Sequence, residues 1–319
     1  MKAAGLSRFG GPEVLQVFEV PEPHAGPGEV RIRVHAATVN PGDRDMRIGA
    51  VPLAALGPPY IPGMEAAGVL DEIGDGTVTD LRIGDRVMAM VMPNRAQGGA
   101  YTEYVVLAAE WVVRAPADTT HVEAATVPMN GLTARLALDL LALTPGQTLA
   151  VTGAAGGFGG YVVQLAKADG LSVVADSSPA DEELVRGLGA DMIVPRGGDA
   201  ARSFLSAVPG GADGLVDGAS IGVSRLVQAV RDGGGMAAVR GESPYPAGET
   251  ETRRRGVRSH MVYVPDYFGD RRKLDALRHA VESGALTTRV ARTFPPEQAA
   301  DAHRLLEAGG FRGRLVLEF

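Results

Sequence analysis

Short segments in which apolar and polar residues alternate fill the first third of the chain. In "EVRIRVHAATVN", residues 29–40, the apolar Val30, Ile32 and Val34 alternate with charged or polar side chains. A period of two is typical of a strand that is buried on one face. Glycine and proline separate this segment from similar ones, and no long helical pattern interrupts them. The first third is therefore predicted to be a compact β-rich unit.

The pattern changes to helical spacing near residue 121, and from residue 148 strand-like and helix-like segments alternate. "TLAVTG" at 148–153 and "LSVVAD" at 171–176 are strand-like, whereas "YVVQLAKADG" at 161–170 has a helical period. The same period predicts a helix for "VSRLVQAVRD" at 223–232. Such alternation is typical of parallel strands joined by crossover helices. The middle of the chain is therefore predicted to be an α/β domain with a parallel sheet.

The last part of the chain predicts two helices and a strand. "RRKLDALRHAVESG" at 271–284 and "PEQAADAHRLLEAG" at 296–309 have helical spacing, and "GRLVLEF" at 313–319 is strand-like. Gly309 and Gly310 are expected to end the second helix, because glycine tolerates the left-handed conformation common at helix ends. We expect this short return to rejoin the first unit.

Length and composition agree with a two-domain globular protein. At 319 residues the chain exceeds the size at which a single core usually stops growing. Hydrophobic residues make up 45% and charged residues 22%, and no run of about 18 apolar residues predicts a membrane span. No apolar signal core follows the first residues, so a cytoplasmic location is expected. The predicted boundaries are 1–124 and 265–319 for the β-rich domain and 125–264 for the α/β domain.

Charge and cysteine content narrow the chemistry. The net charge of −7 argues against a nucleic-acid partner, because binding to phosphates needs a positive surface. The basic segment "RRRGVR" at 253–258 is interpreted as a solvated loop. The chain has no cysteine, which excludes disulfides, thiolate nucleophiles and cysteine-ligated zinc.

A glycine-rich turn lies between the predicted strand at 148–153 and the predicted helix at 161–170. Its glycines Gly153, Gly156 and Gly159 recur every third residue. Glycine lets the backbone approach a pyrophosphate, and the helix N-terminus offers unpaired N–H groups and a partial positive charge. A structural turn is the alternative, but the strand-turn-helix setting favours a dinucleotide. The predicted cofactor contacts here are Gly153, Ala154, Ala155, Gly156, Gly157, Phe158 and Gly159.

The end of the next strand, in "LSVVADSSPADEE", bears on the choice between NAD and NADP. Asp176 favours NAD if its carboxylate reaches the adenosine ribose. Ser177 and Ser178 suit the additional phosphate of NADP, and Arg196 supplies a nearby positive charge. Asp176 has a second interpretation as the cap of the following turn. NADPH is the expected cofactor, with NADH as the alternative.

Taken together, several short motifs resemble the medium-chain dehydrogenase/reductase superfamily, most closely its zinc-independent quinone oxidoreductase and enoyl reductase branch. The resemblance covers nearly the full length, and it depends on the order and spacing of the motifs. They are "ATVNPGDRDMRIG", "IPGMEAAGVL", "GDRVMAM", "GGAYTEYVV", "AATVPMNGLTARLAL", the glycine-rich turn and "FPPEQAADAHRLLEAGGFRGRLVL". It implies a GroES-like domain built from both termini, a doubly wound Rossmann domain, an active site in the cleft between them, and a homodimer.

The same resemblance identifies a departure from the zinc-dependent relatives. Those enzymes use cysteine and the histidine of a "GHE" motif, whereas this chain has "GME", with Met64 at the histidine position. A thioether is a poor zinc ligand, so no zinc is expected and Met64 is interpreted as core packing. Without a metal, the expected reaction is hydride addition to a quinone or to the β-carbon of an α,β-unsaturated carbonyl.

The resemblance also implies roles for individual residues. Asn40 is expected near the nicotinamide ribose or the substrate carbonyl, Thr133 beside the nicotinamide, and Gly241 among the cofactor contacts. Structural roles are the alternatives, and Asn40 before Pro41 is also a good turn residue. The leading hypothesis is an NAD(P)H-dependent reductase of quinones or activated alkenes. The alternatives are an enoyl reductase that tailors a larger biosynthetic intermediate and a catalytically silent dinucleotide-binding protein.

The tyrosine that the family often places after "NP", where it can touch the substrate or donate a proton, corresponds here to Asp45. Tyr60, in "PPYIPG", is the proposed replacement, with loop packing as the alternative. Arg47 matches a common family arginine and is otherwise a solvated or ion-paired side chain. Glu65 is expected to be buried and hydrogen-bonded near the cleft. All six histidines are interpreted as structural, because none has metal-ligand spacing.

Overall fold

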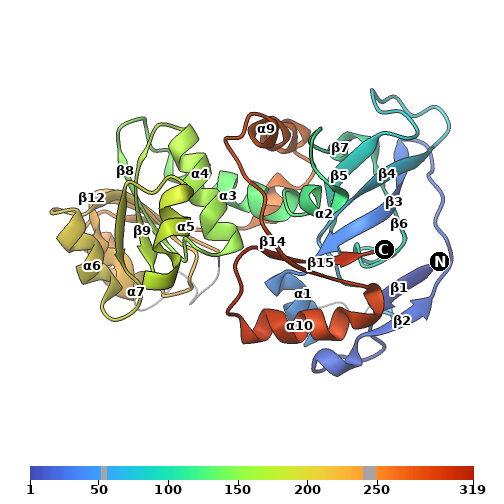
Figure 1. The fold of residues 1–319 in the computed structure, drawn as a ribbon, viewed down its shortest axis with the longest axis horizontal. Coiled ribbons are helices and arrows are strands. Elements are labelled where there is room, and N and C mark those ends of the chain that lie inside the picture. Colours follow the sequence, from blue (N-terminus) through green and yellow to red (C-terminus); the bar gives the residue numbers. More distant parts are fainter. Residues whose placement is uncertain (52–55, 240–248) are drawn as a thin grey trace. The chain divides into compact units, whose positions relative to one another are not determined.

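The chain forms two compact units, which are described separately (Figure 1). The computed structural model describes residues 1–51, 56–239 and 249–319. The first unit comprises Met1–Met129, Phe268–Gly284 and Thr288–Phe319. The second unit comprises Asn130–Tyr267 and Ala285–Thr287.

The second unit is built on a six-stranded parallel sheet with the strand order β10-β9-β8-β11-β12-β13. The predicted α/β fold with a parallel sheet is confirmed. The order reverses between β8 and β11, and ligands of such sheets bind at the carboxyl ends of the strands beside this reversal. The strands are β8 (Thr148–Thr152), β9 (Ser172–Ser177), β10 (Met192–Pro195), β11 (Ala212–Asp217), β12 (Val230–Ala238) and β13 (Arg258–Met261).

Helix α3 leads into β8, and the later helices of this region lie between successive parallel strands. Helix α4 packs against β8 and β9, and most of its residues are buried. The helix predicted for residues 223–232 is too long, because the chain becomes strand β12 at Val230, which pairs with Ala212 of β11. The helices are α3 (Pro128–Leu141), α4 (Gly157–Ala168), α5 (Glu182–Gly187), α6 (Ala200–Ala207), α7 (Val223–Leu226) and α8 (Glu249–Arg254).

The basic segment at 253–258 is not the solvated loop that the sequence predicted. Its first two residues end helix α8, and Arg254 pairs with Glu251. The Arg255 guanidinium lies 2.7 Å from the Asp232 carboxylate and donates to the carbonyls of Val227 and Val230. These arginines therefore hold α8 against the start of β12.

The first unit contains a mixed seven-stranded sheet and a two-stranded β1-β2 ribbon. The predicted alternation along β3 is confirmed, since Val30, Ile32 and Val34 are buried. The final strand β15 pairs antiparallel with β3, so the C-terminal residues complete this sheet. The strands are β1 (Lys2–Gly5), β2 (Gln16–Glu19), β3 (Glu29–Thr38), β4 (Glu65–Ile73), β5 (Arg86–Met90), β6 (Tyr104–Ala108), β7 (Val113–Arg114), β14 (Val290–Phe294) and β15 (Arg314–Glu318).

A short helix that the sequence did not predict follows β3. Helix α1 (Pro41–Arg47) begins after Asn40, and proline suits its first position, where no N–H partner is needed. The Asn40 N–H donates to the Asp43 carboxylate at 2.8 Å, which is one half of a capping box. The other helices of this unit are α2 (His121–Ala124), α9 (Arg271–Glu282) and α10 (Ala299–Ala308). Gly309 ends α10 as predicted, with a φ of 66°.

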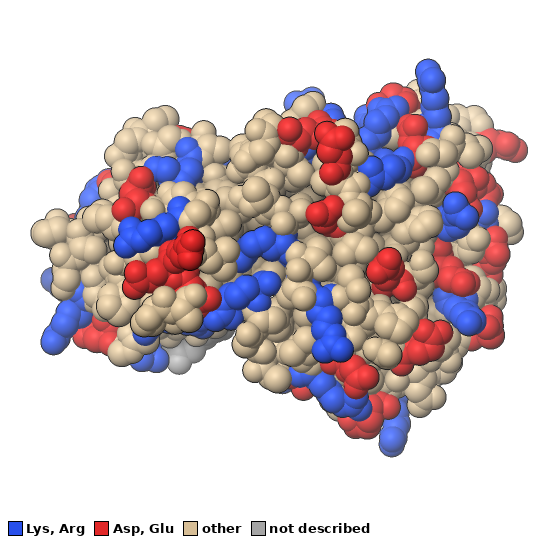
Figure 2. Space-filling model, viewed as in Figure 1, with Lys and Arg blue, Asp and Glu red and all other residues tan. Residues whose placement is uncertain are grey.

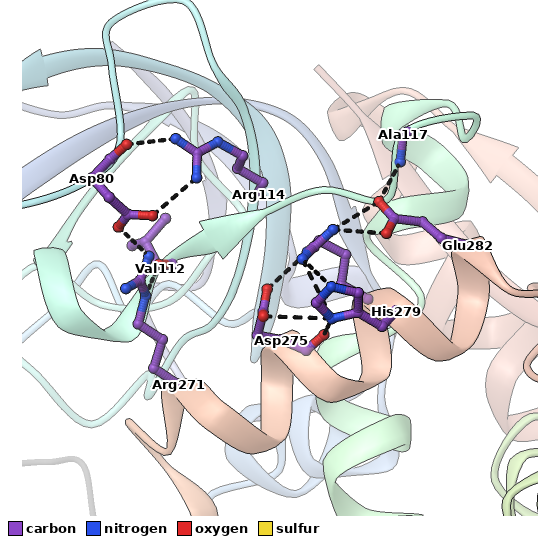
Figure 3. Close-up of polar contacts among 9 residues, drawn as sticks. Asp80, Val112, Arg114, Ala117, Arg271, Asp275, His279 and Glu282 are labelled. Carbon is purple, nitrogen blue, oxygen red and sulfur yellow. Dashed lines mark hydrogen bonds and ion pairs between the residues drawn. The ribbon is translucent and has the colours of Figure 1, made fainter.

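Ion pairs join helix α9 to β7 and to the loops around it (Figure 3). Asp80 binds both Arg114 of β7 and Arg271 of α9, and Arg271 also donates to the Val112 carbonyl at 3.3 Å. Farther along α9, Glu282 accepts the Ala117 N–H at 3.1 Å. A cavity of about 450 Å³ lies among these charges, lined by Asp80, Arg114, Arg271, Arg272, Asp275 and Arg278. The charged side chains thus attach the returning segment to the sheet.

Charged side chains of both signs are interspersed over the face of the molecule shown in Figure 2. Within the part of the chain that the structure describes, none of the helices combines the length and the hydropathy that a bilayer span requires.

Candidate functional site

The glycine-rich turn, residues 153–159, leads from the carboxyl end of β8 into helix α4. Gly153 has a φ of 71°, which favours glycine, and its carbonyl accepts the Gly156 N–H at 2.9 Å. A Cβ atom on Gly159 would lie 2.3 Å from the Gly153 carbonyl oxygen. The turn and the helix are therefore too close for any residue but glycine at position 159.

This turn suits the pyrophosphate of a dinucleotide. Helix α4 has 12 residues, begins after Gly156 and carries no acidic residue in its first turn. The positive end of its dipole is therefore not compensated by a carboxylate of that turn. An anion at this helix N-terminus would supply the missing negative charge.

Asp176 of β9 holds the glycine-rich turn in place through hydrogen bonds to its backbone. Its Oδ1 accepts the N–H groups of Gly153 at 2.7 Å and Ala154 at 3.3 Å. Burial raises the pKa of Asp176, whereas these two hydrogen bonds and the charge of Arg196 act in the opposite direction. The sequence left a ribose contact and a turn cap as alternatives, and the structure adds a third role as a brace of the glycine-rich turn.

The groups expected to bind an additional phosphate are mostly engaged within the chain. The Ser177 hydroxyl donates to the Ser178 carbonyl at 2.9 Å, and the Ser178 hydroxyl donates to the Asp181 carboxylate at 2.6 Å. The Arg196 side chain is exposed, and the backbone N–H of Arg196 donates to the Ser177 carbonyl at 2.8 Å. A phosphate here would have to displace the Ser178 hydroxyl from Asp181.

Asp217 is a buried carboxylate at the carboxyl end of β11 and was not among the predicted site residues. It accepts the Thr152 hydroxyl at 2.7 Å and the Gly222 N–H at 2.9 Å. An aspartate at the end of the apolar strand in "GLVDGAS" is the sequence feature from which this residue could have been predicted. A cavity of about 320 Å³ opens beyond the ends of β10 and β11, lined by Gly198, Asp199, Ala200, Ile221 and Arg225. This is the edge at which α/β sheets bind ligands.

Asn40 belongs to a buried polar cluster in the first unit. The amide cluster, as we call it, consists of Thr38, Asn40, Glu65 and Arg314. Arg314 donates to Asn40 Oδ1 at 2.7 Å and to Glu65 Oε1 at 2.6 Å. The Asn40 Nδ2 group in turn lies 3.1 Å from Thr38 Oγ1 and 3.3 Å from Glu65 Oε1. These bonds fix which end of the Asn40 amide points toward Arg314.

Glu65 links this cluster to the start of α3, where its Oε2 accepts the Met129 N–H at 2.7 Å. The side chain is fully buried, which confirms the expectation that Glu65 is buried and hydrogen-bonded. Arg314 was missed by the sequence analysis. A single arginine at the start of the apolar strand in "GRLVLEF" was the signal, since a buried arginine needs a paired carboxylate.

A second buried chain of polar groups adjoins Asn40, and we call it the Asp43 chain: Asp43, Tyr101 and His303. Asp43 accepts the N–H groups of Asn40 and Gly63, both at 2.8 Å, and the Tyr101 hydroxyl at 3.3 Å. Tyr101 also lies 3.3 Å from His303 Nε2 on α10. Burial raises the pKa of Asp43 to about 7 and lowers that of His303 to about 3.

Met64 was predicted to pack in the core; it is half-buried and packs against α1. A Cβ atom on Gly42 would lie 2.6 Å from the Met64 sulfur, so the two residues are in close contact. Among the described residues, no three histidine, cysteine, aspartate or glutamate side chains are grouped closely enough to hold a metal ion.

The other predicted site residues are distributed over both units. Tyr60 pairs through its backbone with Leu6, and its partly exposed ring stacks on Phe9 at 4.9 Å. Thr133 is half-buried in α3 of the second unit. Asp45, at the position of the family tyrosine, lies 3.2 Å from the Arg44 guanidinium. Gly241 lies outside the described residues.

Of the two structural interpretations of Arg47, the ion pair is confirmed and the solvated side chain is wrong. Arg47 is only 1% exposed and pairs with Glu307 of α10. Its Nε and one Nη group are buried without a hydrogen-bond partner among the described residues. The residue therefore connects α1 to α10.

The free energy of unfolding is expected to depend on pH, because burial favours the neutral form of His303 in the folded protein. Its pKa falls from 6.5 to about 3 on folding, so it contributes stability above pH 6.5 that is lost as the pH falls toward 3. Relative to His303→Gln, the wild type is expected to lose on the order of 3 kcal/mol of unfolding free energy between pH 6.5 and 4. Urea unfolding of both proteins at several pH values measures the difference. Parallel curves for the two proteins would contradict the assignment.

Comparison with known proteins shows matches along the chain. Residues 26–117 match the model of the alcohol dehydrogenase GroES-like domain, and residues 188–317 match a model described as zinc-binding dehydrogenase. An alcohol dehydrogenase from Geobacillus stearothermophilus is 33% identical, over 100% of this chain and 99% of the relative. A 2-haloacrylate reductase from a Burkholderia species is 31% identical, over 99% of this chain and 98% of the relative.

Further relatives and solved structures share the fold over the full chain. An NADPH-dependent alkenal/one oxidoreductase from Arabidopsis thaliana chloroplasts is 31% identical, over 99% of this chain and 79% of the relative. A structure of an NAD-dependent alcohol dehydrogenase has a TM-score of 0.90 at 28% identity, with both chains fully covered. The quinone oxidoreductase from Coxiella burnetii has a TM-score of 0.86 at 27% identity, over 100% of this chain and 99% of that one. The parallel sheet with its glycine-rich turn, the separate β-rich unit and these matches show that the chain belongs to the medium-chain dehydrogenase/reductase family of oxidoreductases.

Proposed function

We propose that the protein is a zinc-independent, NADPH-dependent oxidoreductase that transfers hydride to a quinone or to an α,β-unsaturated carbonyl. The observation that carries the proposal is the glycine-rich turn, whose Gly159 leaves no room for a side chain and whose helix lacks an acidic first turn. The names of the relatives, a 2-haloacrylate reductase and an alkenal/one oxidoreductase, support an electron-poor alkene as the acceptor.

In the proposed reaction, the protein has to orient the nicotinamide against the acceptor and to stabilise the negative charge that develops on the acceptor. When bound, the nicotinamide supplies a hydride to the β-carbon of an enone or to a quinone. An enone would then carry negative charge on its carbonyl oxygen and take a proton at the α-carbon, whereas a quinone would become a hydroquinone anion that takes its proton from water. Asn40 and Thr133 are proposed to contact the nicotinamide ribose or the substrate, and Tyr60 to supply the proton. Hydrogen-bond donors aimed at the developing oxyanion account for much of such catalysis.

Zinc independence is proposed from the donor set of this chain. Met64 occupies the position at which the "GHE" relatives have their zinc-binding histidine, and its sulfur packs against Gly42. With no cysteine in the sequence, thiolate ligands are absent as well. Activity that survives exhaustive treatment with a strong chelator supports the proposal, and activity that zinc restores after chelation overturns it.

NADH is the second candidate cofactor, and Asp176 is the observation in its favour. Its carboxylate lies near the end of β9, and two residues later in the chain the Ser178 hydroxyl is already bound to Asp181. Two carboxylates would repel the additional phosphate of NADPH, whereas the ribose hydroxyls of NADH could donate to Asp176. Arg196, which is exposed, is the cation available to oppose this repulsion.

Fluorescence titration with NADPH and NADH, followed by a panel of quinones, enones and enoyl thioesters, tests the proposal. NADPH is expected to bind at least tenfold more tightly, which corresponds to about 1.4 kcal/mol. Arg196→Ala is expected to remove most of that preference, while Arg202→Ala, an exposed arginine on α6, leaves it unchanged. Tighter binding of NADH would assign the second candidate instead.

The substrate panel separates the remaining hypotheses. Turnover of small quinones or enones supports the proposal, and turnover of enoyl thioesters alone points to an enoyl reductase of a larger biosynthetic intermediate. Tight cofactor binding without any turnover would leave a catalytically silent dinucleotide-binding protein. A cytoplasmic location and a homodimer are further parts of the proposal, and gel filtration with light scattering tests the second.

A further inference from the structure

Asp43 is a fully buried carboxyl group to which the proposed reaction gives no role. It lies on α1, three residues after Asn40, and accepts three hydrogen bonds from three different segments. Oδ2 accepts the Asn40 N–H and the Tyr101 hydroxyl, and Oδ1 accepts the Gly63 N–H. The structure places three donors and no acceptor around the carboxyl group, an arrangement that matches the ionised form, which only accepts hydrogen bonds.

The donors belong to the segments that carry the amide cluster. Asn40 is itself a member of that cluster, and Gly63 lies two residues before Glu65. By accepting both backbone N–H groups, Asp43 holds the turn at Asn40 next to the start of β4. This contact keeps Asn40 Nδ2 within 3.3 Å of Glu65 Oε1.

We propose that Asp43 is a positioning residue: in its ionised form it fixes the backbone of Asn40 against that of Gly63, and so orients the Asn40 amide for the bound dinucleotide or acceptor. The inference rests on the proposed function, in which Asn40 contacts one of these molecules. It does not make Asp43 a catalytic residue, because the carboxylate is enclosed by protein.

The surroundings of Asp43 bring its pKa close to neutral pH. Burial is the main cause that raises its pKa to about 7, and the charge of Glu65 adds to it. The hydrogen bonds from Asn40, Gly63 and Tyr101 favour the ionised form. The titratable and charged groups around it are Glu65 of β4, Tyr101 before β6, His303 of α10, Arg314 of β15 and, beside His303, Arg47 of α1.

Protonation of Asp43 has a defined structural consequence. A proton on Oδ2 would oppose the Asn40 N–H and the Tyr101 hydroxyl, which both point at that oxygen. Tyr101 can then turn its O–H toward His303 Nε2, 3.3 Å away, and its oxygen can accept a hydrogen bond from the protonated Asp43. His303 is available as an acceptor because burial keeps it neutral. The Asn40 N–H has no such second acceptor in this arrangement, so its hold on α1 weakens.

The test combines two variants with a matched control. Asp43→Asn removes the negative charge, and Tyr101→Phe removes one donor while keeping both backbone bonds. Tyr104→Phe is the control, because Tyr104 lies on β6 with its ring against Arg31, away from Asp43. The measurements are the hydrogen-exchange rates of the Asn40 and Gly63 amides at fixed pH and the pH dependence of kcat/KM with a quinone and NADPH.

In the wild type, kcat/KM is expected to rise with an apparent pKa near 7. Asp43→Asn is expected to abolish this rise, to lower kcat/KM roughly tenfold at pH 8 and to accelerate exchange at both amides. Tyr101→Phe is expected to move the apparent pKa upward by about 0.5 to 1 unit, because the lost hydroxyl favoured the ionised form. Tyr104→Phe is expected to leave all three readouts unchanged.

The outcomes separate this inference from the proposed function. Unchanged exchange at Asn40 and Gly63 in Asp43→Asn would overturn the positioning role. If Asp43→Asn does not fold, an unshifted pH profile in Tyr101→Phe overturns it instead. If the wild type turns over no quinone or enone, the proposed function fails, and the exchange rates alone decide whether Asp43 holds the Asn40 turn.

Discussion

Replacing Arg314 with methionine is expected to destabilise the protein by about 3 to 5 kcal/mol. The substitution would leave the fully buried Glu65 carboxyl group without its partner, from which it is now 2.6 Å away. It would also remove the donor to Asn40 Oδ1 at 2.7 Å. Urea unfolding at pH 7, followed by circular dichroism, measures the loss.

Two controls show whether the buried charge is the cause. The double variant Glu65→Gln/Arg314→Met removes both charges and is expected to recover much of the lost stability, because no unpaired ion remains in the interior. Arg304→Met breaks an exposed ion pair with Asp301 on α10 and should leave the unfolding free energy almost unchanged. A small effect of Arg314→Met, similar to that of Arg304→Met, would show that the buried pair contributes little.

Replacing Gly159 with alanine is expected to weaken dinucleotide binding by tenfold or more, that is, by at least about 1.4 kcal/mol. The new Cβ atom would lie 2.3 Å from the Gly153 carbonyl oxygen and 2.7 Å from its carbon. Both atoms belong to the backbone, so α4 must move away from the turn, and its N-terminus with it. Forcing a side chain into such a contact also costs about 1 to 3 kcal/mol of stability. Fluorescence titration with NADPH checks the first effect, and thermal unfolding checks the second.

Gly187 provides a matched glycine for comparison. It lies in α5 of the same unit, and a Cβ atom there would have no neighbour within 4 Å. Gly187→Ala should therefore leave both affinity and stability close to those of the wild type, or raise stability slightly because alanine favours helix. Equal affinities for Gly159→Ala and the wild type would show that the turn does not bind the dinucleotide.

Local sequence patterns predicted those features that depend on neighbouring residues. The glycine-rich turn between a strand and a helix could be predicted because a close approach of two backbone segments requires glycine. Alternation of apolar residues in β3 and helical spacing in α9 and α10 were readable for the same reason. The errors also came from local patterns: residues 230–232 have a helical period but form the start of β12, because pairing with β11 overrides that preference.

The candidate site of the first unit was only partly readable. Asn40 and Glu65 could be singled out from their motifs, but their partner Arg314 lies 274 residues from Asn40 in the chain. Similarly, Asp43 meets Tyr101 at a separation of 58 residues, and Tyr101 meets His303 at 202. No period or spacing in the sequence relates positions so far apart.

The sequence by itself therefore determined the class of fold, the glycine-rich turn between a strand and a helix, and the lack of thiolate zinc ligands, because each depends on residue type or on short-range periodicity. Only the tertiary structure decided that Asp176 braces the turn, that Arg314 orients the Asn40 amide and that Asp43 joins Asn40 to Gly63. The physical reason is that hydrogen bonds and burial of charge depend on which distant strands and helices pack together. The contacts of Arg314 form only when the sheet of the first unit brings β3, β4 and β15 side by side, and the contact of Asp176 forms only when β9 pairs with β8 in the second unit.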